Sequence, residues 1–321
     1  MDIVCLGELL VDMYPVEVGR RLAEVSAFRP TPGGAPANVA VAAARLGMAS
    51  AFIGKVGDDA FGRFLATVLE REGVTTRGVR FDRRTRTTMA FIAMPDENSA
   101  EFMFYRHPGA DTLLSVEELD RDLLREARVF HFGSVSLTDE PSRTATLEAA
   151  RLARGAGALV SFDVNYRPTL WTSPSEAHET ISAALAYVNL LKVNEVELPL
   201  LSGVEDVEAG SRALLERGPH ICVVTLGRKG SFYQTVEGGE HVPGFVVPTV
   251  DAIGCGDAFV AALLTSLISS GDWRAQLVPG RMRRLVRYAN AAGALTAQQR
   301  GVIPALPTAA AIEAFLARCG E

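Results

Sequence analysis

The chain has 321 residues, of which 48% are hydrophobic and 22% are charged. That length supports a large hydrophobic core, and the composition excludes a mainly disordered or collagen-like protein. With a net charge of −6, the chain lacks the excess of basic residues that is typical of a nucleic-acid-binding protein.

In chain order, short apolar runs that predict buried strands alternate with segments of helical periodicity. The predicted strands cover residues 3–6, 51–53, 129–132, 158–162, 190–193 and 221–225, and residues 245–250 look strand-like as well. The predicted helices include residues 35–46, 61–72, 142–154 and 258–268. This alternation is typical of an α/β fold with a doubly wound, mainly parallel sheet flanked by helices.

Two segments break the rhythm, because residues 14–32 and 85–105 look extended and the second contains a hairpin pattern around a turn at residues 95–98. We expect a single domain over residues 1–321, with a small β-sheet lid formed by about 12–32 and 84–108 as excursions from it. The hairpin is apolar on both faces, with Met89, Phe91 and Ala93 on one and Phe102 and Phe104 on the other. An exposed sheet of this kind tends to associate, so we predict a homodimer formed through the lid.

Gly33 and Gly34 precede a predicted helix that carries Asn38 in its first turn. The glycines allow a ligand to approach the backbone closely, and an amide side chain both donates and accepts hydrogen bonds, as a polyhydroxylated ligand requires. An ordinary glycine turn with Asn38 on the surface explains the pattern about equally well.

A second glycine-rich turn, residues 251–257, leads into the predicted helix 258–268. The backbone amides of Gly254, Cys255 and Gly256 can point together at the helix N-terminus and form an anion hole. Asp257 stands where the helix starts, and from these residues alone a simple N-cap is the favoured interpretation.

Two further turns follow predicted strands. Lys192 precedes Asn194 and Glu197, which share a face of a helical turn and could hold the hydrated shell of Mg²⁺. The turn from Thr225 to Gly230 carries two cations and suits a phosphate tail. Each turn alone could be ordinary surface structure, and neither a Walker A loop nor a Gly-x-Gly-x-x-Gly dinucleotide motif is present.

Taken together and in this order, these segments resemble the ribokinase-like (PfkB) family of carbohydrate kinases over nearly the whole chain. The resemblance rests on residues 33–38, 54–62, 194–197, 225–230, 251–259 and 290–295. It implies a ribokinase-like fold and transfer of the ATP γ-phosphoryl group, with Mg²⁺, to a sugar hydroxyl.

The resemblance also implies roles for individual residues. Asp257 is the general base, and the amides of Gly254, Cys255 and Gly256 cradle the transferring phosphoryl group. The expected nucleotide contacts are Lys192, Asn194, Thr225, Gly227, Gly230, Gly254, Gly256 and Asn290, and Asn194 and Glu197 organise Mg²⁺ through water.

Family members often bind K⁺ beside the anion hole, through groups near Asp251, Ile253 and the turn at residues 300–301. The family signature usually reads Asp-Thr-x-Gly-Ala-Gly-Asp, whereas this chain has Ala252 and Cys255 at the threonine and alanine positions. Activation by K⁺ is therefore an open expectation, while Asp257 and both glycines remain.

Sugar specificity is expected from Gly33, Gly34, Asn38 and Asp257 together with Asp12, Arg106 and Arg167. The stretch 104–111 closely resembles fructokinases, and 163–171 is similar to a segment that fructokinases share with 2-keto-3-deoxygluconate kinases. We predict phosphorylation of fructose to fructose 6-phosphate, with 2-keto-3-deoxygluconate kinase as the alternative if both arginines converge on one pocket.

Each of these three side chains also has an explanation without substrate binding. Asp12 could lie in a solvated turn, Arg106 could form a salt bridge with Asp111, and Arg167 could pack on Trp171 at the surface. Ribokinase, nucleoside kinase and an inactive sugar-binding regulatory protein are weaker options.

The four cysteines form no Cys-x-x-Cys pair, which argues against a zinc site or a disulfide framework and suits a reducing compartment. The N-terminus lacks a signal-peptide pattern, and the apolar run 258–268 is too short to span a bilayer. We expect a cytoplasmic protein whose partners are ATP and a small sugar, without nucleic acid or membrane.

Overall fold

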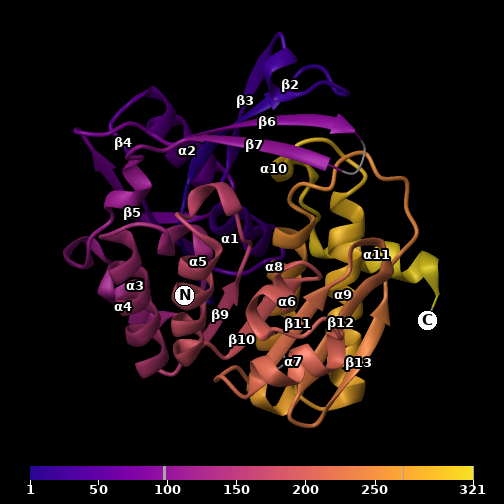
Figure 1. Ribbon diagram of the computed structural model, residues 1–321. Helices are drawn as coiled ribbons and strands as arrows, with labels where there is room; N and C mark the ends of the chain where they lie inside the picture. Colours follow the sequence, from indigo (N-terminus) through magenta and orange to yellow (C-terminus); the bar gives the residue numbers. More distant parts are fainter. Residues whose placement is uncertain (97–98, 270, 321) are drawn as a thin grey trace.

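One large sheet runs through the middle of the molecule, in the strand order β13-β12-β11-β10-β9-β8-β1-β4-β5 (Figure 1). The structure is a computed structural model and describes residues 1–96, 99–269 and 271–320. Its strands are β1 (Ile3–Leu6), β4 (Ser50–Gly57), β5 (Thr75–Asp82), β8 (Val129–Gly133), β9 (Leu159–Asp163), β10 (Leu190–Asn194), β11 (Ile221–Thr225), β12 (Gly230–Thr235) and β13 (Gly238–Pro243). The pairs from β5 to β11 are parallel, while β12 and β13 add an antiparallel edge.

Helices cover both faces of this sheet. One face carries α1 (Ala35–Arg45), α2 (Ala60–Arg71), α8 (Cys255–Ser269), α9 (Pro279–Thr296), α10 (Val302–Ala305) and α11 (Ala309–Cys319). The other carries α3 (Arg121–Glu126), α4 (Ser142–Gly155), α5 (Pro174–Ala184), α6 (Glu197–Ser202) and α7 (Val207–Leu215). Alternate residues of β1 enter the two cores, which explains why this strand is a continuous apolar run. The predicted doubly wound α/β class is confirmed.

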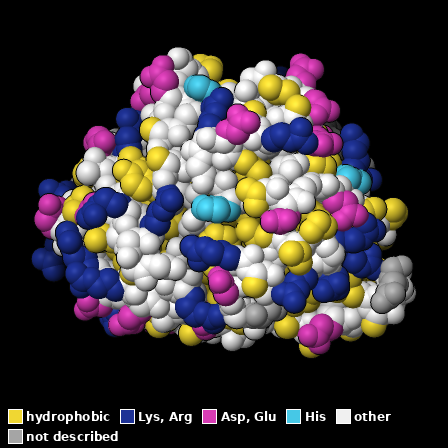
Figure 2. Space-filling view, turned by 90° about the horizontal axis from the view of Figure 1, so that it is seen from below, with side chains coloured by type: hydrophobic (Ala, Val, Ile, Leu, Met, Phe, Trp, Pro, Cys, Tyr) yellow, Lys and Arg dark blue, Asp and Glu magenta, His cyan; other side chains and the backbone are white. Residues whose placement is uncertain are grey.

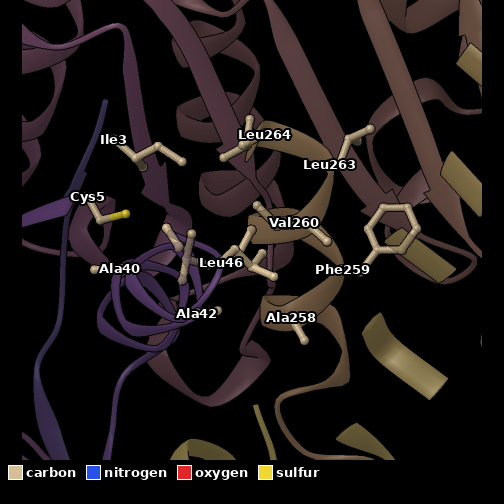
Figure 3. Packing of buried hydrophobic residues seen from close by; sticks show 14 of the residues in the cluster. Ile3, Cys5, Ala40, Ala42, Leu46, Ala258, Phe259, Val260, Leu263 and Leu264 are labelled. Atoms are coloured by element: carbon tan, nitrogen blue, oxygen red, sulfur yellow. The ribbon is translucent and has the colours of Figure 1, made fainter. Parts of the chain in front are cut away.

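Helices α1 and α8 pack against each other over β1 (Figure 3). Their small residues permit a close approach, and the larger side chains of α8 fill the space beside them. Figure 3 labels Ile3, Cys5, Ala40, Ala42, Leu46, Ala258, Phe259, Val260, Leu263 and Leu264 in this core. Close packing of this kind fixes where the N-termini of both helices lie.

A separate four-stranded sheet lies at one end of the molecule, at the top of Figure 1. Its order is β3-β2-β6-β7, from β2 (Leu10–Pro15), β3 (Phe28–Gly33), β6 (Met89–Asp96) and β7 (Ser99–Tyr105). The predicted small sheet is confirmed, and we call it the lid. Residues 97–98 of the predicted turn lie outside the described residues.

The two faces of the lid differ. On the outer face Phe91 pairs with Met103 and Met89 with Tyr105, and the rings of Phe28 and Phe91 are 5.1 Å apart. Met103 and Tyr105 remain 43% and 59% exposed. On the inner face the rings of Phe102 and Phe104 stack at 6.3 Å.

One strand prediction is wrong. Residues 245–250 form no strand, although they are apolar and partly β-branched. Pro248 cannot donate to a ladder and Val246 is fully exposed, so the segment pairs with no strand, although Phe245 and Val247 pack against the core. It is held at both ends, since the rings of Phe245 and Phe315 are 5.0 Å apart and the Val250 amide donates to the Ala297 carbonyl at 2.8 Å.

Figure 2 shows the molecule from below, the end away from the lid, where basic and acidic side chains lie among small hydrophobic areas. Mixed charge of this kind suits contact with water. No helix in the described ranges has the length and apolar character needed to cross a bilayer.

Candidate active site

Asp257 lies in the first turn of α8 and is 8% exposed. Its Oδ2 accepts a hydrogen bond of 2.8 Å from Nδ2 of Asn38, which lies on α1 and 219 residues earlier in the chain. Within the described chain no backbone amide donates to this carboxylate, so it is not an N-cap. Burial, with the nearby Asp163 carboxylate adding to it, raises the pKa of Asp257 to about 6. A carboxylate with this pKa can accept a proton near neutral pH.

The turn before α8 presents backbone N–H groups. Those of Gly254, Gly256 and Asp257 have no hydrogen-bond partner among the described residues. The Cys255 amide lies 3.4 Å from the Ala252 carbonyl oxygen, so this member of the predicted set of three is partly engaged. Gly254 has φ +84°, a conformation that favours glycine. Unpaired amides at a helix N-terminus form a site for an anion.

Asp12 lies on the inner face of lid strand β2, beside the glycine turn. An added Cβ on Gly33 would stand 2.0 Å from Oδ2 of Asp12, so any side chain there would displace the carboxylate. Burial raises the pKa of Asp12 to about 7, and the second cause is the negative charge of Asp257. The Asp12 carboxylate has no hydrogen-bond partner among the described residues, nor does the buried Oδ1 of Asn38. Two acceptors therefore remain available beside Asp257 for a ligand's hydroxyl groups.

Gly34 has φ +109° and is the N-cap residue directly before α1. An added Cβ there would meet the carbonyl oxygen of Glu8 at 2.3 Å, and the Ala35 amide donates to Oε1 of Glu8 at 3.0 Å. Burial raises the pKa of Glu8 to about 7. Glu8 thus holds the start of α1, and with it the position of Asn38.

Arg106 and Arg167 do not form a pair. Arg106 is buried, with Nε 2.7 Å from Oδ2 of Asp111, and it also donates to Thr138, Asp139 and the Val135 carbonyl. The salt bridge to Asp111, considered as an alternative, is confirmed. All three guanidinium nitrogens are engaged by the protein, which leaves Arg106 no free edge for a bidentate contact with a sugar-acid carboxylate.

The positive charge of Arg167 lowers the pKa of both Asp12 and Asp257. Its guanidinium group therefore lies near these two carboxylates. Its guanidinium carbon is 5.4 Å from the ring centroid of Phe102 on the inner lid face. It therefore connects the body of the molecule to the lid, whereas packing on Trp171 was the alternative.

Lys192 is buried behind the anion hole, and its Nζ lies 3.0 Å from Oδ1 of Asp163. The ammonium would be 3.4 Å from an added Cβ on Gly256. The Asp163 carboxylate keeps this lysine charged by raising its pKa despite burial.

Asn194 and Glu197 form a local cap. Glu197 is buried and accepts from the amides of Tyr166 at 2.7 Å and Asn194 at 2.9 Å, while Oδ1 of Asn194 accepts from the amides of Val196 and Glu197. In the described ranges no three His, Cys, Asp or Glu side chains gather as a metal cage. Any divalent ion here would have most of its ligands from phosphates and water.

Around the carboxyl end of β11 lie four of the predicted nucleotide residues, Thr225, Gly227, Gly230 and, through Ser231, Asn290 of α9. Thr225 ends β11, and Gly227 and Gly230 have φ +56° and +99° in the turn that follows. Asn290 on α9 accepts from Ser231 Oγ at 2.9 Å and donates to the Val242 carbonyl at 3.1 Å. Its amide is engaged within the protein, so it shapes this end of the site through β12 and β13.

Asp251 is buried, and both of its carboxylate oxygens accept hydrogen bonds. Oδ1 accepts from the Ile253 amide at 2.9 Å, and Oδ2 from the Gly301 amide at 3.2 Å and from the Tyr14 hydroxyl at 3.0 Å. Asp251 therefore lies beside the turn at residues 300–301, whereas cation binding by Asp251 or Ile253 stays a prediction.

Sequence reasoning missed three residues of the site. Glu8 and Tyr14 flank Asp12, and Asp163 is the last residue of β9. A signal for Asp163 was present, because charged residues at the carboxyl ends of parallel strands meet at one edge of the sheet. Glu8 and Tyr14 gave no such signal, since their partners lie 27 and 237 residues away.

The family model for pfkB family carbohydrate kinases matches residues 1–309. Fructokinase-2 of Solanum lycopersicum is 45% identical over 308 residues, which is 96% of this chain and 93% of the relative.

Two solved structures are similar over nearly their whole length. Fructokinase with bound ATP from Xylella fastidiosa has a TM-score of 0.91 and 34% identity, covering 100% of this chain and 99% of that one. A fructokinase double mutant from Vibrio cholerae in its fructose-, ADP- and potassium-bound form has a TM-score of 0.89 and 35% identity, covering 98% of each chain.

Proposed function

Because the chain belongs to the pfkB family of carbohydrate kinases, we propose that it is an ATP-dependent fructokinase that converts fructose to fructose 6-phosphate. The observation that carries the proposal is the contact between Asn38 and Asp257. It places two hydroxyl-binding side chains, from α1 and α8, next to unpartnered amides that suit a phosphoryl group.

In this proposal Asp257 takes the proton of the attacking hydroxyl as the γ-phosphoryl group leaves ATP. Asp12 and Asn38 hold neighbouring hydroxyls of the sugar through their free acceptors. The amides of Gly254 and Gly256 bind the transferring group, and Lys192 places positive charge behind them. Positioning and charge stabilisation of this kind are the main demands of phosphoryl transfer.

The choice of fructose over 2-keto-3-deoxygluconate rests on the arginines. A sugar acid would favour two guanidinium groups converging on one carboxylate. Arg106 instead pairs with Asp111 and Asp139, and only Arg167 faces the aspartates of the site. We therefore assign Arg167 to substrate binding and Arg106 to holding the segment after β7 in place.

ATP is proposed to lie over the end of β11, with its phosphates passing Asn194 and the glycines of the turn 227–230. Mg²⁺ would neutralise charge on those phosphates. Asn194 and Glu197 suit contact with Mg²⁺ through water and not direct coordination, because their side-chain oxygens already accept hydrogen bonds from backbone amides. We propose that these two residues contact its water shell.

K⁺ binding near Asp251 and Ile253 is proposed as well, since the Vibrio cholerae fructokinase structure contains potassium. Oδ2 of Asp251 already accepts two hydrogen bonds, so the carbonyl oxygens of the turn would supply most ligands. Turnover in KCl compared with NaCl at equal ionic strength tests this.

We further propose a homodimer through the outer lid face, where Met103 and Tyr105 are exposed beside Phe91. Sedimentation at micromolar concentration should give a dimer, and a monomer would contradict the proposal.

A cytoplasmic location is proposed from the cysteines, all four of which are free thiols.

The function is tested by a coupled ADP-release assay with fructose, 2-keto-3-deoxygluconate, ribose and adenosine. We expect fructose to give the highest kcat/KM, and ³¹P NMR should identify the product as fructose 6-phosphate. A higher kcat/KM for the sugar acid would replace fructose as the substrate, and no ADP release with any acceptor would favour a non-catalytic sugar-binding protein.

A further inference from the structure

Tyr14 lies on lid strand β2, two residues after Asp12 and on the same face of the sheet. It is 5% exposed, and its hydroxyl donates a buried hydrogen bond of 3.0 Å to Oδ2 of Asp251. The two residues are 237 positions apart in the chain. This bond therefore joins the lid directly to the body of the molecule.

The acceptor of this bond is tied to the anion hole. Oδ1 of Asp251 accepts from the Ile253 amide at 2.9 Å, one residue before Gly254. Oδ2 also accepts from the Gly301 amide at 3.2 Å, and an added Cβ on Gly254 would meet the neighbouring Val302 side chain at 2.4 Å. One carboxylate thus links β2, the anion-hole turn and the start of α10.

We propose that Tyr14 is a positioning residue that couples the place of Asp12, on the lid, to the place of the Gly254 and Gly256 amides in the body. The proposal rests on the proposed function of the site. When the lid strand is in place, the hydroxyl completes the shell around Asp251 and the turn 252–256 is held. When the strand moves away, Asp251 loses a donor and the turn loses a support.

The alternative is a purely structural tyrosine that happens to satisfy a buried carboxylate. Both roles predict a lower Tm on removing the hydroxyl, because a buried hydrogen bond is lost. Only the coupling role predicts that the sugar and phosphoryl sides of the site lose their alignment together. Measurements besides stability separate the two.

The test is Tyr14→Phe, with Tyr233→Phe as the matched control. Tyr233 is also buried, and its hydroxyl donates to Glu240 at 3.1 Å and to the Pro279 carbonyl at 2.9 Å, away from the lid. For Tyr14→Phe we expect kcat/KM for fructose to fall on the order of tenfold, the equivalent of one hydrogen bond. We also expect more ADP release per sugar phosphate formed, because water reaches the phosphoryl group when the lid is loose.

Hydrogen exchange of the Ile253 and Ala258 amides, which are hydrogen-bonded on either side of the anion hole, supplies a readout that does not depend on activity. The coupling predicts faster exchange there in Tyr14→Phe than in Tyr233→Phe at a matched fall in Tm. Equal exchange and equal kinetics in the two variants would overturn the proposal. If the wild type does not phosphorylate fructose, the proposed function fails, while the exchange comparison still decides whether Tyr14 holds the turn.

Discussion

Replacing Asp257 with asparagine separates the chemistry of the site from its architecture. Asparagine has nearly the same shape, and its Oδ1 can still accept the hydrogen bond from Nδ2 of Asn38. Fructose binding should therefore persist. The general base is lost, which lowers kcat by roughly 10²–10⁴-fold, or about 3–5 kcal/mol in activation free energy.

The same substitution should stabilise the fold. The pKa of Asp257 rises from 3.8 to about 6 on folding, so its ionised form is disfavoured in the native state. At pH 8 this destabilises the wild type by up to about 3 kcal/mol. Asparagine removes that penalty, and for a chain of this length Tm should rise by about 4 °C at most.

The sign of the pH dependence follows. Below pH 4 the carboxyl is protonated in both folded and unfolded states, so the gain in Tm should vanish between pH 6 and pH 4. In the wild type, kcat should fall as pH drops through about 6, because the base becomes protonated. Steady-state kinetics and thermal unfolding from pH 4 to 8 measure both effects. Retention of more than a tenth of kcat, or a lower Tm at pH 8, would refute this account of Asp257.

Three further substitutions test the geometry. Gly254→Ala should lower kcat at least tenfold, because φ is +84° and the new Cβ would lie 2.4 Å from a side chain of α10. Gly256→Ala is the milder control, since its added Cβ would have its nearest contact at 3.4 Å. Equal losses of kcat in the two variants would count against backbone strain at Gly254 as the cause. Gly33→Ala should raise KM for fructose at least tenfold with a smaller change in KM for ATP, since its Cβ would displace Asp12; parallel rises in both constants would contradict this. Arg106→Met should destabilise the fold by about 3–5 kcal/mol, because it leaves the buried Asp111 carboxylate without its charged partner; an unchanged urea midpoint would show that the ion pair is not needed.

The sequence predicted those parts of the fold and site that local patterns encode. Strands 3–6 and 221–225 are found with their predicted bounds, because a strand buried on both faces is a continuous apolar run. The glycine turns predicted the N-termini of α1 and α8. Backbone with positive φ at Gly34 and Gly254 favours glycine, so the local sequence reports these turns.

What depends on distant contacts was not predictable in this way. Residues 245–250 have the composition of a strand but no neighbour to pair with. Arg106 had a local partner in Asp111, yet its other acceptors, at 135, 138 and 139, come from a segment about thirty residues on. The shared carboxylate of Asp251 depends on the lid folding over the body, which no local pattern reports.

The candidate site draws its residues from both the lid and the α/β body, and this separation bears on how substrate preference can change among relatives. Asp12 and the Phe102 ring, on the inner lid face, are carried by short strands inserted between elements of the α/β body, whereas Asp257 and its amides belong to that body. Grafting the four inserted strands from a relative with another acceptor should therefore exchange the preferred alcohol and leave the handling of ATP intact. Tyr14 with Asp251, and Phe102 with Arg167, are two contacts between lid and body at which such a chimera would have to be matched.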